Sequence, residues 1–447
     1  MVIACPHCAT VQTMPRPPFR GRLECRVCED VLERTAGRSL DSALACTLTA
    51  FLLWFPANFF SLMTIRGPAG LISNTHLFGG CVIIWRLGWP VMAVVLALQG
   101  IILPFFRFGL LAATLLAVRH GARGSWVGRC FRWSERLDEW AMPDVFLLAG
   151  AIGYGRVAAL IPVRIDSGGF ALMAAAIMTM LVRATLDRRS VWRRIAAFPD
   201  YVAPDAIACT ECDLVLPPRL KGGPCPRCAA RLHRRKPYST MRTGALTLAS
   251  LVLLPVANLY PMSIFYKEGI PHAQTIFIGV QLLFQNGFAP LGVLIFVTSI
   301  GFPITKLLAL CWFLLSVRQR TARWLRFKTK FYRFIAEIGR WSNLDPFTLV
   351  IFTPMVQFGQ IAHFGVGGGG PAFLAMVVIS MFAADSFDPR LLWDAGREAP
   401  VPRSPGTKMW EGQRFQNSRG RVDFEINRSV TRQPNSVHDR EAGARPF

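Results

Sequence analysis

Eight of the 12 cysteines form four Cys-x-x-Cys pairs, and these pairs come in two sets. In each set the second pair follows the first after a spacer of 16 or 12 residues. Two tight turns joined by such a spacer bring four thiolates together as tetrahedral ligands of a metal ion. The predicted ligands are Cys5, Cys8, Cys25 and Cys28 in the first set, and Cys209, Cys212, Cys225 and Cys228 in the second.

Zinc is the metal that this pattern favours, with one ion for each set and so two per chain. Zinc adds no redox chemistry and suits thiols kept free in a reducing cytosol. Iron bound as in rubredoxin uses the same four ligands, and the spacing does not exclude it. A thiol oxidant is a further alternative for the pair Cys5 and Cys8. The chain shows no βαβ pattern around this pair, and such oxidants need one.

The two sets mark an internal repeat of about 200 residues. Corresponding residues keep an offset between 199 and 201 over most of the chain, which indicates a tandem duplication. The matched residues include Cys25 with Cys225, Asn58 with Asn258, Arg107 with Lys306, Trp140 with Trp341, and Asp144 with Asp345.

The composition places the chain among membrane proteins. It is 52% hydrophobic, its mean hydropathy is +0.35, and yet it carries 50 Lys and Arg against 27 Asp and Glu. Apolar segments and charges must therefore be segregated. A helix that crosses about 30 Å of hydrocarbon needs roughly 20 apolar residues. Eight stretches qualify, four in each half: 43–65, 90–118, 143–163, 168–186, 244–266, 288–317, 345–365 and 371–387.

Lys and Arg gather on one side of these stretches. They fill the N-terminal region, the linkers between the second and third stretches, the central linker and the C-terminal tail, whereas the opposite loops hold only Arg66, Arg164 and Lys267. Both termini and both cysteine sets are therefore predicted to be cytoplasmic. No cleaved signal peptide is expected, because the N-terminus starts with a cysteine pair. The net charge of +23 reflects this topology and attraction to anionic lipid, not nucleic-acid binding.

The predicted fold is an all-α polytopic membrane protein. It is a tandem repeat of four transmembrane helices, and a small four-cysteine, zinc-ribbon-like domain heads each half. The tail is poor in bulky apolar residues, so it is predicted to be disordered and cytoplasmic. The predicted domains are ribbon 1 (1–40), the first membrane module (41–195), ribbon 2 (196–240), the second membrane module (241–395) and the tail (396–447).

Two cations and two amides occupy matching positions inside apolar stretches. Arg107 and Lys306 each follow a proline by three residues. A cation there must be paired, reach the membrane interface or face a hydrated cavity, where it would bind a lipid phosphate. Asn58 and Asn258 lie toward the end of an apolar helix, where each amide bonds to protein or contacts a lipid headgroup. All four are candidate lipid-binding residues.

Asp144 and Asp345 each open a predicted helix. A carboxylate in the first turn meets exposed N–H groups and the positive end of the helix dipole, so a structural cap is expected, with proton coupling as the alternative. The basic segments 126–140 and 324–341 are expected to lie as amphipathic helices on the cytoplasmic face. No phosphate-binding glycine loop and no nucleophile with a neighbouring base is apparent, so no enzymatic activity is expected.

Three further motifs accompany the cysteine sets: Pro56-Ala57-Asn58, a Trp-x-x-x-Asp sequence at 140–144 and 341–345, and Phe387-Asp388-Pro389-Arg390 followed by Trp393. Together with the cysteine sets they resemble the paraquat-inducible protein A family over residues 1–395. The first half departs from this pattern at its end, where it reads Leu-Asp-Arg-Arg in place of Phe-Asp-Pro-Arg, so the halves are expected to have unequal roles.

The resemblance implies a multi-pass protein of the bacterial inner membrane that works with a periplasmic mammalian-cell-entry domain protein. Its implied role is to load or receive phospholipid at the base of a periplasmic tunnel, which supports envelope integrity. Two alternatives remain open. One is a membrane redox or stress protein with iron in its ribbons, and the other is a structural adaptor for a periplasmic assembly.

Overall fold

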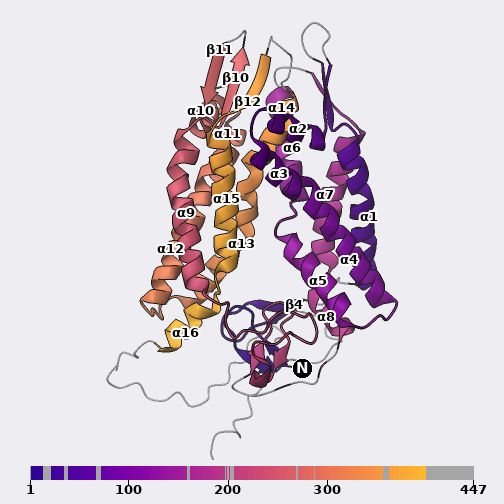
Figure 1. Cartoon of the computed structure of the whole chain (residues 1–447), viewed down its shortest axis with the longest axis vertical. Helices are drawn as coiled ribbons and strands as arrows, with labels where there is room; N and C mark the ends of the chain where they lie inside the picture. Colours follow the sequence, from indigo (N-terminus) through magenta and orange to yellow (C-terminus); the bar gives the residue numbers. More distant parts are fainter. Residues whose placement is uncertain are drawn as a thin grey trace, which may run out of the picture. The chain divides into compact units, whose positions relative to one another are not determined.

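The two halves fold into the same succession of helices and short strands in a computed structural model of the protein (Figure 1). The first half contains α1 (Leu40–Phe59), β5 (Met63–Arg66), β6 (Ile72–Thr75), α2 (Leu77–Arg86), α3 (Pro90–Ala97), η2 (Leu98–Ile102), α4 (Leu103–Arg119), α5 (Ser125–Asp138), α6 (Pro143–Ala158), β7 (Val163–Ile165), α7 (Ser167–Thr185) and α8 (Arg188–Ile195). The second half contains α9 (Ser239–Leu259), β10 (Ser263–Lys267), β11 (Ile270–Gln274), α10 (Ile276–Gln285), α11 (Ala289–Phe296), η4 (Val297–Gly301), α12 (Phe302–Arg318), α13 (Leu325–Ile338), η5 (Gly339–Asn343), α14 (Leu344–Met355), β12 (Ala362–Val366), α15 (Gly369–Ser386) and α16 (Arg390–Glu398).

Short strands also form the two ribbons. Ribbon 1 contains β1 (Val2–Ala4), β2 (Val11–Thr13), β3 (Arg22–Glu24) and β4 (Val31–Arg34), and ribbon 2 contains β8 (Ile207–Ala208), β9 (Val215–Leu216) and the short helix η3 (Pro218–Leu220). The structure describes residues 2–13, 22–34, 39–66, 72–158, 162–196, 198, 201, 206–267, 270–285, 287–355 and 362–398. The predicted disordered tail lies outside these ranges except for its first residues, which end α16.

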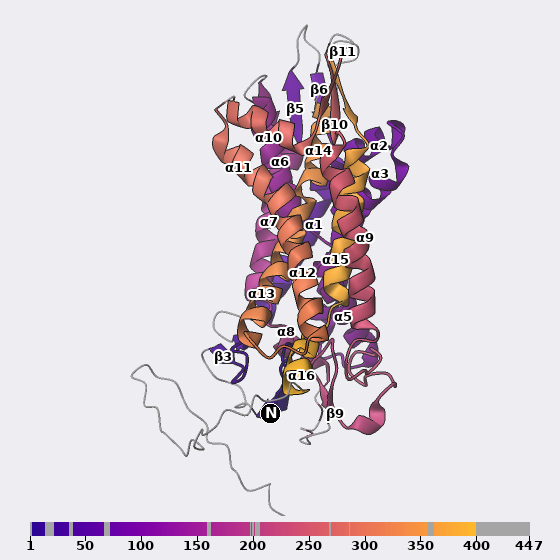
Figure 2. The same cartoon turned by 90° about the vertical axis from the view of Figure 1, so that its left-hand side faces the viewer.

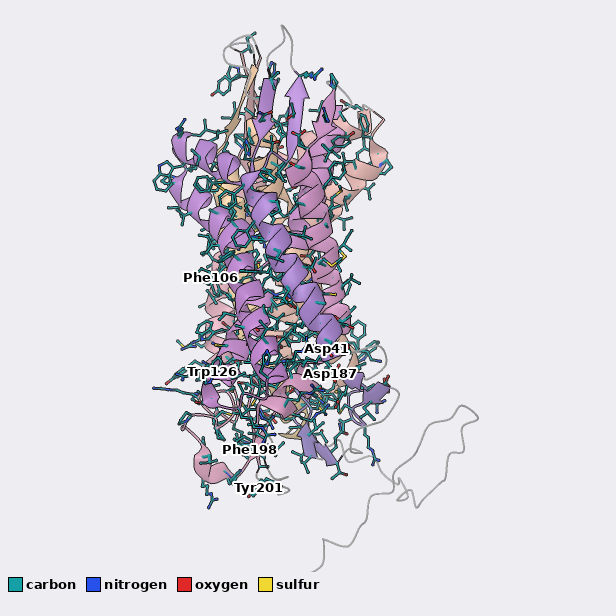
Figure 3. All side chains as sticks on the ribbon, turned by 90° about the vertical axis from the view of Figure 1, so that its right-hand side faces the viewer. Asp41, Phe106, Trp126, Asp187, Phe198 and Tyr201 are labelled. Atoms are coloured by element: carbon teal, nitrogen blue, oxygen red, sulfur yellow. The ribbon has the colours of Figure 1, made fainter. Side chains whose placement is uncertain are left out.

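Six helices of the described residues are long and apolar enough to cross a membrane. Exposed phenylalanines and leucines cover them, as expected for surfaces that face lipid. In Figure 3, Phe106 lies on this helical surface, whereas Asp41 and Asp187 lie nearer the ribbons. The six are α1, α3 with η2 and α4, α7, α9, α11 with η4 and α12, and α15.

The third crossing of each half differs from the prediction. The predicted spans 143–163 and 345–365 correspond to α6 and α14, whose 16 and 12 residues are too short to cross about 30 Å alone. The preceding helices α5 and α13 were predicted to lie flat on the cytoplasmic face, but they run alongside the second crossing of their half. Asp138 at the end of α5 reaches back to Arg107, so α5 runs antiparallel to α4. Each third crossing therefore consists of two helices with a break between them.

The second half repeats this hairpin. Ser316 of α12 accepts a hydrogen bond from the Lys328 amine of α13, and farther along the pair Gly339 lies against Lys306. The break after α13 is the 3₁₀-helix η5. Sequence periodicity missed the break because α5 and α13 are amphipathic, and their basic residues suggested a surface position.

A small antiparallel sheet ends each half at the side opposite the ribbons (Figures 1 and 2). The strand order is β6-β5-β7 in the first half and β11-β10-β12 in the second. Met63 pairs with both Thr75 and Ile165, which places the far ends of α1 and α6 at the same level. These sheets were not predicted, because each strand has only three to five residues.

The second crossing of each half contains one π-helical turn, η2 or η4. A proline follows at once, Pro104 after η2 and Pro303 after η4. Proline has no N–H and its ring crowds the preceding turn, and a π-helical turn relieves that crowding without ending the helix. Arg107 and Lys306 lie one turn beyond these prolines, so the irregularity sets the direction in which each cation points.

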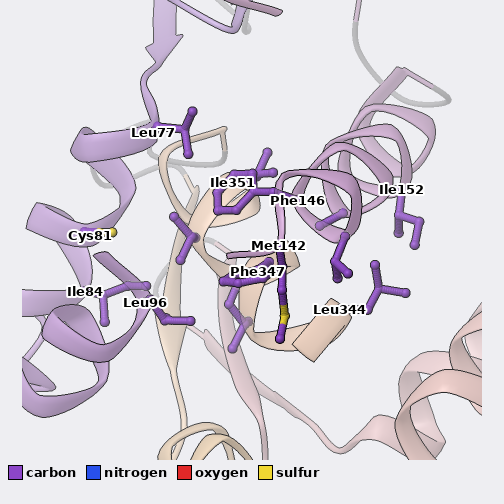
Figure 4. Close-up of a cluster of buried hydrophobic side chains, with 14 of the residues drawn as sticks. Leu77, Cys81, Ile84, Leu96, Met142, Phe146, Ile152, Leu344, Phe347 and Ile351 are labelled. Atoms are coloured by element: carbon purple, nitrogen blue, oxygen red, sulfur yellow. The ribbon is translucent and has the colours of Figure 1, made fainter. Parts of the chain in front are cut away.

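The two halves meet along α6, α14 and α2. The rings of Phe146 and Phe347 have centroids 4.9 Å apart, and Ser73 Oγ donates to the Pro354 carbonyl at 2.8 Å. Figure 4 shows apolar side chains of both halves in this cluster, among them Leu77, Ile84 and Leu344. Apolar burial therefore joins the halves inside the protein, where α6 and α14 need no direct contact with lipid.

Gly80 of α2 provides a test of this contact. A Cβ atom at Gly80 would lie 2.0 Å from the Val350 carbonyl oxygen of α14, whereas one at Gly79 would meet only ordinary contacts. We expect Gly80→Ala to lower the free energy of unfolding by about 1–3 kcal/mol, because the backbones must separate. Gly79→Ala should raise it slightly through helix propensity. The measurement is the midpoint of thermal unfolding in detergent. Equal midpoints for the two variants would mean that Gly80 does not approach Val350 as closely as described.

Candidate functional site

The four cysteines of ribbon 1 converge in space. All four are buried and their sulfur atoms lie within 4.8 Å of one another. Each pair is the turn of a short hairpin, in which the first cysteine exchanges backbone hydrogen bonds with the residues beyond the second. The residue after each second cysteine, Ala9 or Glu29, has a φ of 59°. This left-handed turn directs both thiols of a pair to the same side.

Ribbon 2 has the same construction. Its four cysteines are also buried and clustered, and Asp213 and Ala229 take the left-handed position, with φ of 55° and 56°. The predicted ligand residues of both sets are therefore brought together. No separate signal in the sequence marks the left-handed residues, because none of the four is a glycine.

The geometry of both sets fits a tetrahedral metal ion. Sulfur–sulfur distances of 3.5 and 3.6 Å approach the value of about 3.8 Å required when each sulfur lies 2.3 Å from the metal. Both groups therefore have the ligand types and the shape to bind zinc or iron.

Each ribbon packs beneath helices of a different half. Ribbon 1 begins the first half, yet its cysteines share a buried cluster with Phe313, Ile335 and Trp393 of the second. Three basic residues of α13 hold it there: Arg326 and Lys330 bind Glu29, and Arg333 binds Asp30 at 2.6 Å.

Ribbon 2 is held correspondingly under the first half. Its cysteines share a buried cluster with Leu111, Phe131 and Trp192. Arg136 of α5 binds Glu211 at 2.7 Å, and Arg189 of α8 binds Asp213 at 3.5 Å. Helices α5 and α13 therefore each rest on a ribbon. This contact accounts for three of the four basic residues of α13 and for Arg136 of α5.

Arg107 is neutralised inside the first half. It is 3% exposed, and its guanidinium lies 2.5 Å from the Asp138 carboxylate. Arg183 of α7 also binds Asp138, at 3.2 Å, and binds Asp144 at 2.7 Å. Two cations and two carboxylates thus balance one another's charge at the break between α5 and α6.

The second half lacks this network. Lys306 is 1% exposed, and its Nζ has no hydrogen-bond partner among the described residues. The positions that correspond to Asp138 and Arg183, 201 residues later, are Gly339 and Ala384. Sequence reasoning missed Asp138, Arg183 and Gly339, although comparing the halves position by position would have found the difference.

Two cavities lie on either side of the break in the third crossing of the second half. The first has a volume of about 640 Å³ on the ribbon side, and its walls include Lys306, Gly339 and Arg340. The second has a volume of about 410 Å³ on the sheet side, where Asp345 and Thr348 line it beside apolar residues of α10 and α11. We call them the ribbon-side cavity and the sheet-side cavity. Arg340 lines the ribbon-side cavity and Asp345 lines the sheet-side cavity, so four residues of the chain, Trp341 to Leu344, lie between the two linings.

A family model described as paraquat-inducible protein A matches residues 40–196 and, a second time, residues 240–396. The chain belongs to the paraquat-inducible protein A family. The two matches coincide with the two structural halves and leave the ribbons outside, so the repeat unit of the family is the set of crossings with its end sheet.

Three relatives illustrate the family's range. The lipophilic envelope-spanning tunnel protein A of Escherichia coli (strain K12) is 32% identical over 265 residues, which are 58% of this chain and 61% of that protein. The intermembrane transport protein PqiA of the same strain is 24% identical over 407 residues, 89% of this chain and 96% of that protein. A probable intermembrane transport protein of Haemophilus influenzae is 23% identical over 415 residues, 88% and 95% of the two chains. No solved structure matches the chain.

The motif that closes each half of this family member has a structural explanation. Asp187 caps α8 by accepting hydrogen bonds from the Arg189 and Ser190 amides, and Asp388 accepts one from the Arg390 amide. The tryptophans that follow, Trp192 and Trp393, are buried against the ribbon clusters. The motif therefore joins the last crossing of each half to a ribbon.

The two asparagines that occupy matching positions in the halves bond within their own helices. Asn58 Nδ2 donates to the Trp54 carbonyl at 2.6 Å, and Asn258 Nδ2 donates to the Leu254 carbonyl at 2.8 Å. Both bonds flank the proline inside each helix, where the backbone ladder is interrupted. Headgroup binding by either residue stays a prediction, and so does proton coupling by Asp144 or Asp345.

Proposed function

We propose that this protein is the inner-membrane subunit of an intermembrane phospholipid-transport system. In this proposal the ribbons and both termini face the cytoplasm, since Lys and Arg concentrate there. The end sheets face the periplasm, where a mammalian-cell-entry domain protein receives or supplies the lipid. The names of the family relatives, intermembrane transport protein and envelope-spanning tunnel protein, support this role.

The observation that carries the proposal is the pair of cavities at the broken crossing. Transporters commonly place their substrate sites where a membrane helix is discontinuous, since the exposed helix ends and charged side chains there meet a cavity instead of lipid. Here the break in α13 and α14 lies between the ribbon-side cavity and the sheet-side cavity. Movement at this break would connect the two cavities.

The sheet-side cavity has the character of an acyl-chain site. Leu282, Leu283, Phe288, Leu291 and Phe352 line it, and its volume lies in the usual range of ligand pockets. Helices α10 and α11 form part of its wall and expose large apolar side chains on their other face. A lipid chain would therefore pass from the bilayer to the end sheet beside these helices. No catalytic step is part of the proposal.

Filling this cavity tests the function. A side chain added at Gly279 of α10 meets no atom within 4 Å of its Cβ, so the variant is expected to fold. We expect Gly279→Phe to occupy the cavity, to reduce co-purified phospholipid per chain by at least half, and to abolish rescue of envelope integrity in cells that lack the protein. Lipid phosphorus and growth on detergent would be measured.

Gly155→Phe is the matched control, because a Cβ there also meets open space but does not line the cavity. It should keep both activities. If Gly279→Phe folds and retains lipid and growth, the sheet-side cavity is not on the lipid path. In that case a structural adaptor becomes the favoured role.

A further inference from the structure

Lys306 is a buried cation whose expected partner is missing. Its counterpart Arg107 is neutralised by Asp138, but Gly339 occupies the position of Asp138 in the second half. A Cβ atom at Gly339 would lie only 3.2 Å from Lys306 Nζ. The position from which a carboxylate would reach the amine therefore holds a glycine, which has no side chain beyond a hydrogen atom. A buried charge without a partner is costly, so the site favours an anion from outside the chain.

The space for such an anion is present. Lys306, Gly339 and Arg340 all line the ribbon-side cavity, whose volume of about 640 Å³ exceeds that of one small ion. Among the described residues Arg340 pairs with Glu337, three positions earlier, whose side chain is 71% exposed, and solvent weakens a pair with such an exposed partner. Ser342 on the same short helix adds a buried hydroxyl without a partner among the described residues.

Five carboxylates line this cavity, and four of them bond to other groups. Asp138 belongs to the Arg107 network, Asp385 binds the Lys236 amine at 3.3 Å, and Glu337 binds Arg340. Asp388 accepts the backbone N–H groups of Lys236 and Arg390, at 3.0 and 3.1 Å. Glu139 has no ion pair among the described residues, and it does not bond Lys306 either. The Lys306 amine is therefore unpaired among the described residues, and it is buried behind the wall of a polar cavity.

We propose that Lys306 and the gap left by Gly339 form a binding site for a phosphate group, carried by a phospholipid headgroup or by a free phosphate. Lysine binds phosphate as a compact charge with three donors. Because a Cβ at Gly339 would already lie 3.2 Å from Nζ, an oxyanion reaches the amine from the cavity only when the residues around it move. The site lies in the ribbon-side cavity and does not depend on the sheet-side cavity. Only the possibility that the phosphate belongs to a phospholipid headgroup rests on the proposed transport function.

The test uses the full-length protein in detergent and two probes, phosphatidylglycerol followed by native mass spectrometry and inorganic phosphate followed by calorimetry. Gly339→Asp restores the internal carboxylate, and Lys306→Met removes the charge at similar volume. Both are expected to weaken binding by about tenfold or more, as for loss of a charged hydrogen bond. Gly339→Ala adds volume without charge and is expected to bind within about threefold of the parent.

The outcomes separate the sources of the phosphate. If phosphatidylglycerol binds the parent and both Gly339→Asp and Lys306→Met weaken its binding, the ligand is a headgroup. If the two variants weaken the binding of inorganic phosphate alone, the site takes free phosphate and the headgroup assignment is wrong. Equal binding of both probes by Gly339→Asp and the parent overturns the site, provided that the variant elutes as a folded protein. Gly279→Phe should leave phosphate binding intact, so failure of the transport proposal remains distinguishable.

Discussion

The double variant Cys5→Ser, Cys8→Ser is expected to loosen the second half of the protein although both cysteines precede the first. Ribbon 1 rests against α13 and α16, and its four clustered thiols are placed so that a bound metal ion would hold its two hairpins together. Structural zinc contributes about 10–16 kcal/mol to small metal domains, so its loss unfolds the ribbon. We expect amide hydrogen exchange in α13 and α16 to accelerate by at least about tenfold, measured by mass spectrometry.

Two comparisons make this prediction specific. Cys209→Ser with Cys212→Ser should instead accelerate exchange in α5 and α8, because ribbon 2 rests there. Cys81→Ser lies in α2, in the cluster between the halves and outside both ribbon clusters, and should change neither region. Faster exchange in α5 after loss of Cys5 and Cys8 would contradict the crossed arrangement of the ribbons. Helix α8 does not discriminate, because its Arg193 binds Glu33 of ribbon 1 at 2.7 Å. Metal analysis of the same samples would identify zinc or iron.

The second large effect is expected for Asp138→Asn. This change leaves Arg107 buried without its counter-charge and also removes one partner of Arg183. Breaking one side of a buried ion pair costs about 3–5 kcal/mol, because the remaining charge stays buried. We expect the free energy of unfolding to fall by that amount, measured by denaturation in mixed micelles.

An exposed ion pair serves as the control for this variant. Asp41 binds Arg119 at 3.5 Å, but the two side chains are 74% and 56% exposed. Asp41→Asn should therefore change stability by less than about 1 kcal/mol. Replacing Arg107 and Asp138 together by Met and Leu should recover most of the loss, because no charge then remains unpaired. If Asp138→Asn were as stable as Asp41→Asn, the network would not neutralise Arg107.

The most predictable features were those that depend on local spacing. Four cysteines in two tight turns can meet only at one point, and both predicted ligand sets do so. The repeat predicted two equivalent halves, and the family model matches each of them. Long apolar stretches predicted the first, second and fourth crossings of each half, because hydrocarbon thickness sets a minimum length that a sequence displays directly.

The third crossing was predicted incorrectly for a physical reason. A helix that is polar on one side is expected at the membrane surface, but in α13 the basic side chains Arg326, Lys330 and Arg333 face a ribbon instead. Only the tertiary structure provides the acidic partners that permit this. The end sheets were missed because strands of three to five residues form only when distant segments supply their partners.

By itself, the sequence determined the repeat, the two four-cysteine groups and the membrane character, since each follows from spacing or composition along the chain. The tertiary structure decided which half each ribbon supports, where the third crossing breaks, and which of two equivalent cations is neutralised. Arg107 and Lys306 look alike in sequence, yet one meets Asp138 and the other meets Gly339. Whether a buried cation is neutralised depends on the residues around it, and here those residues lie more than 30 positions away in the sequence.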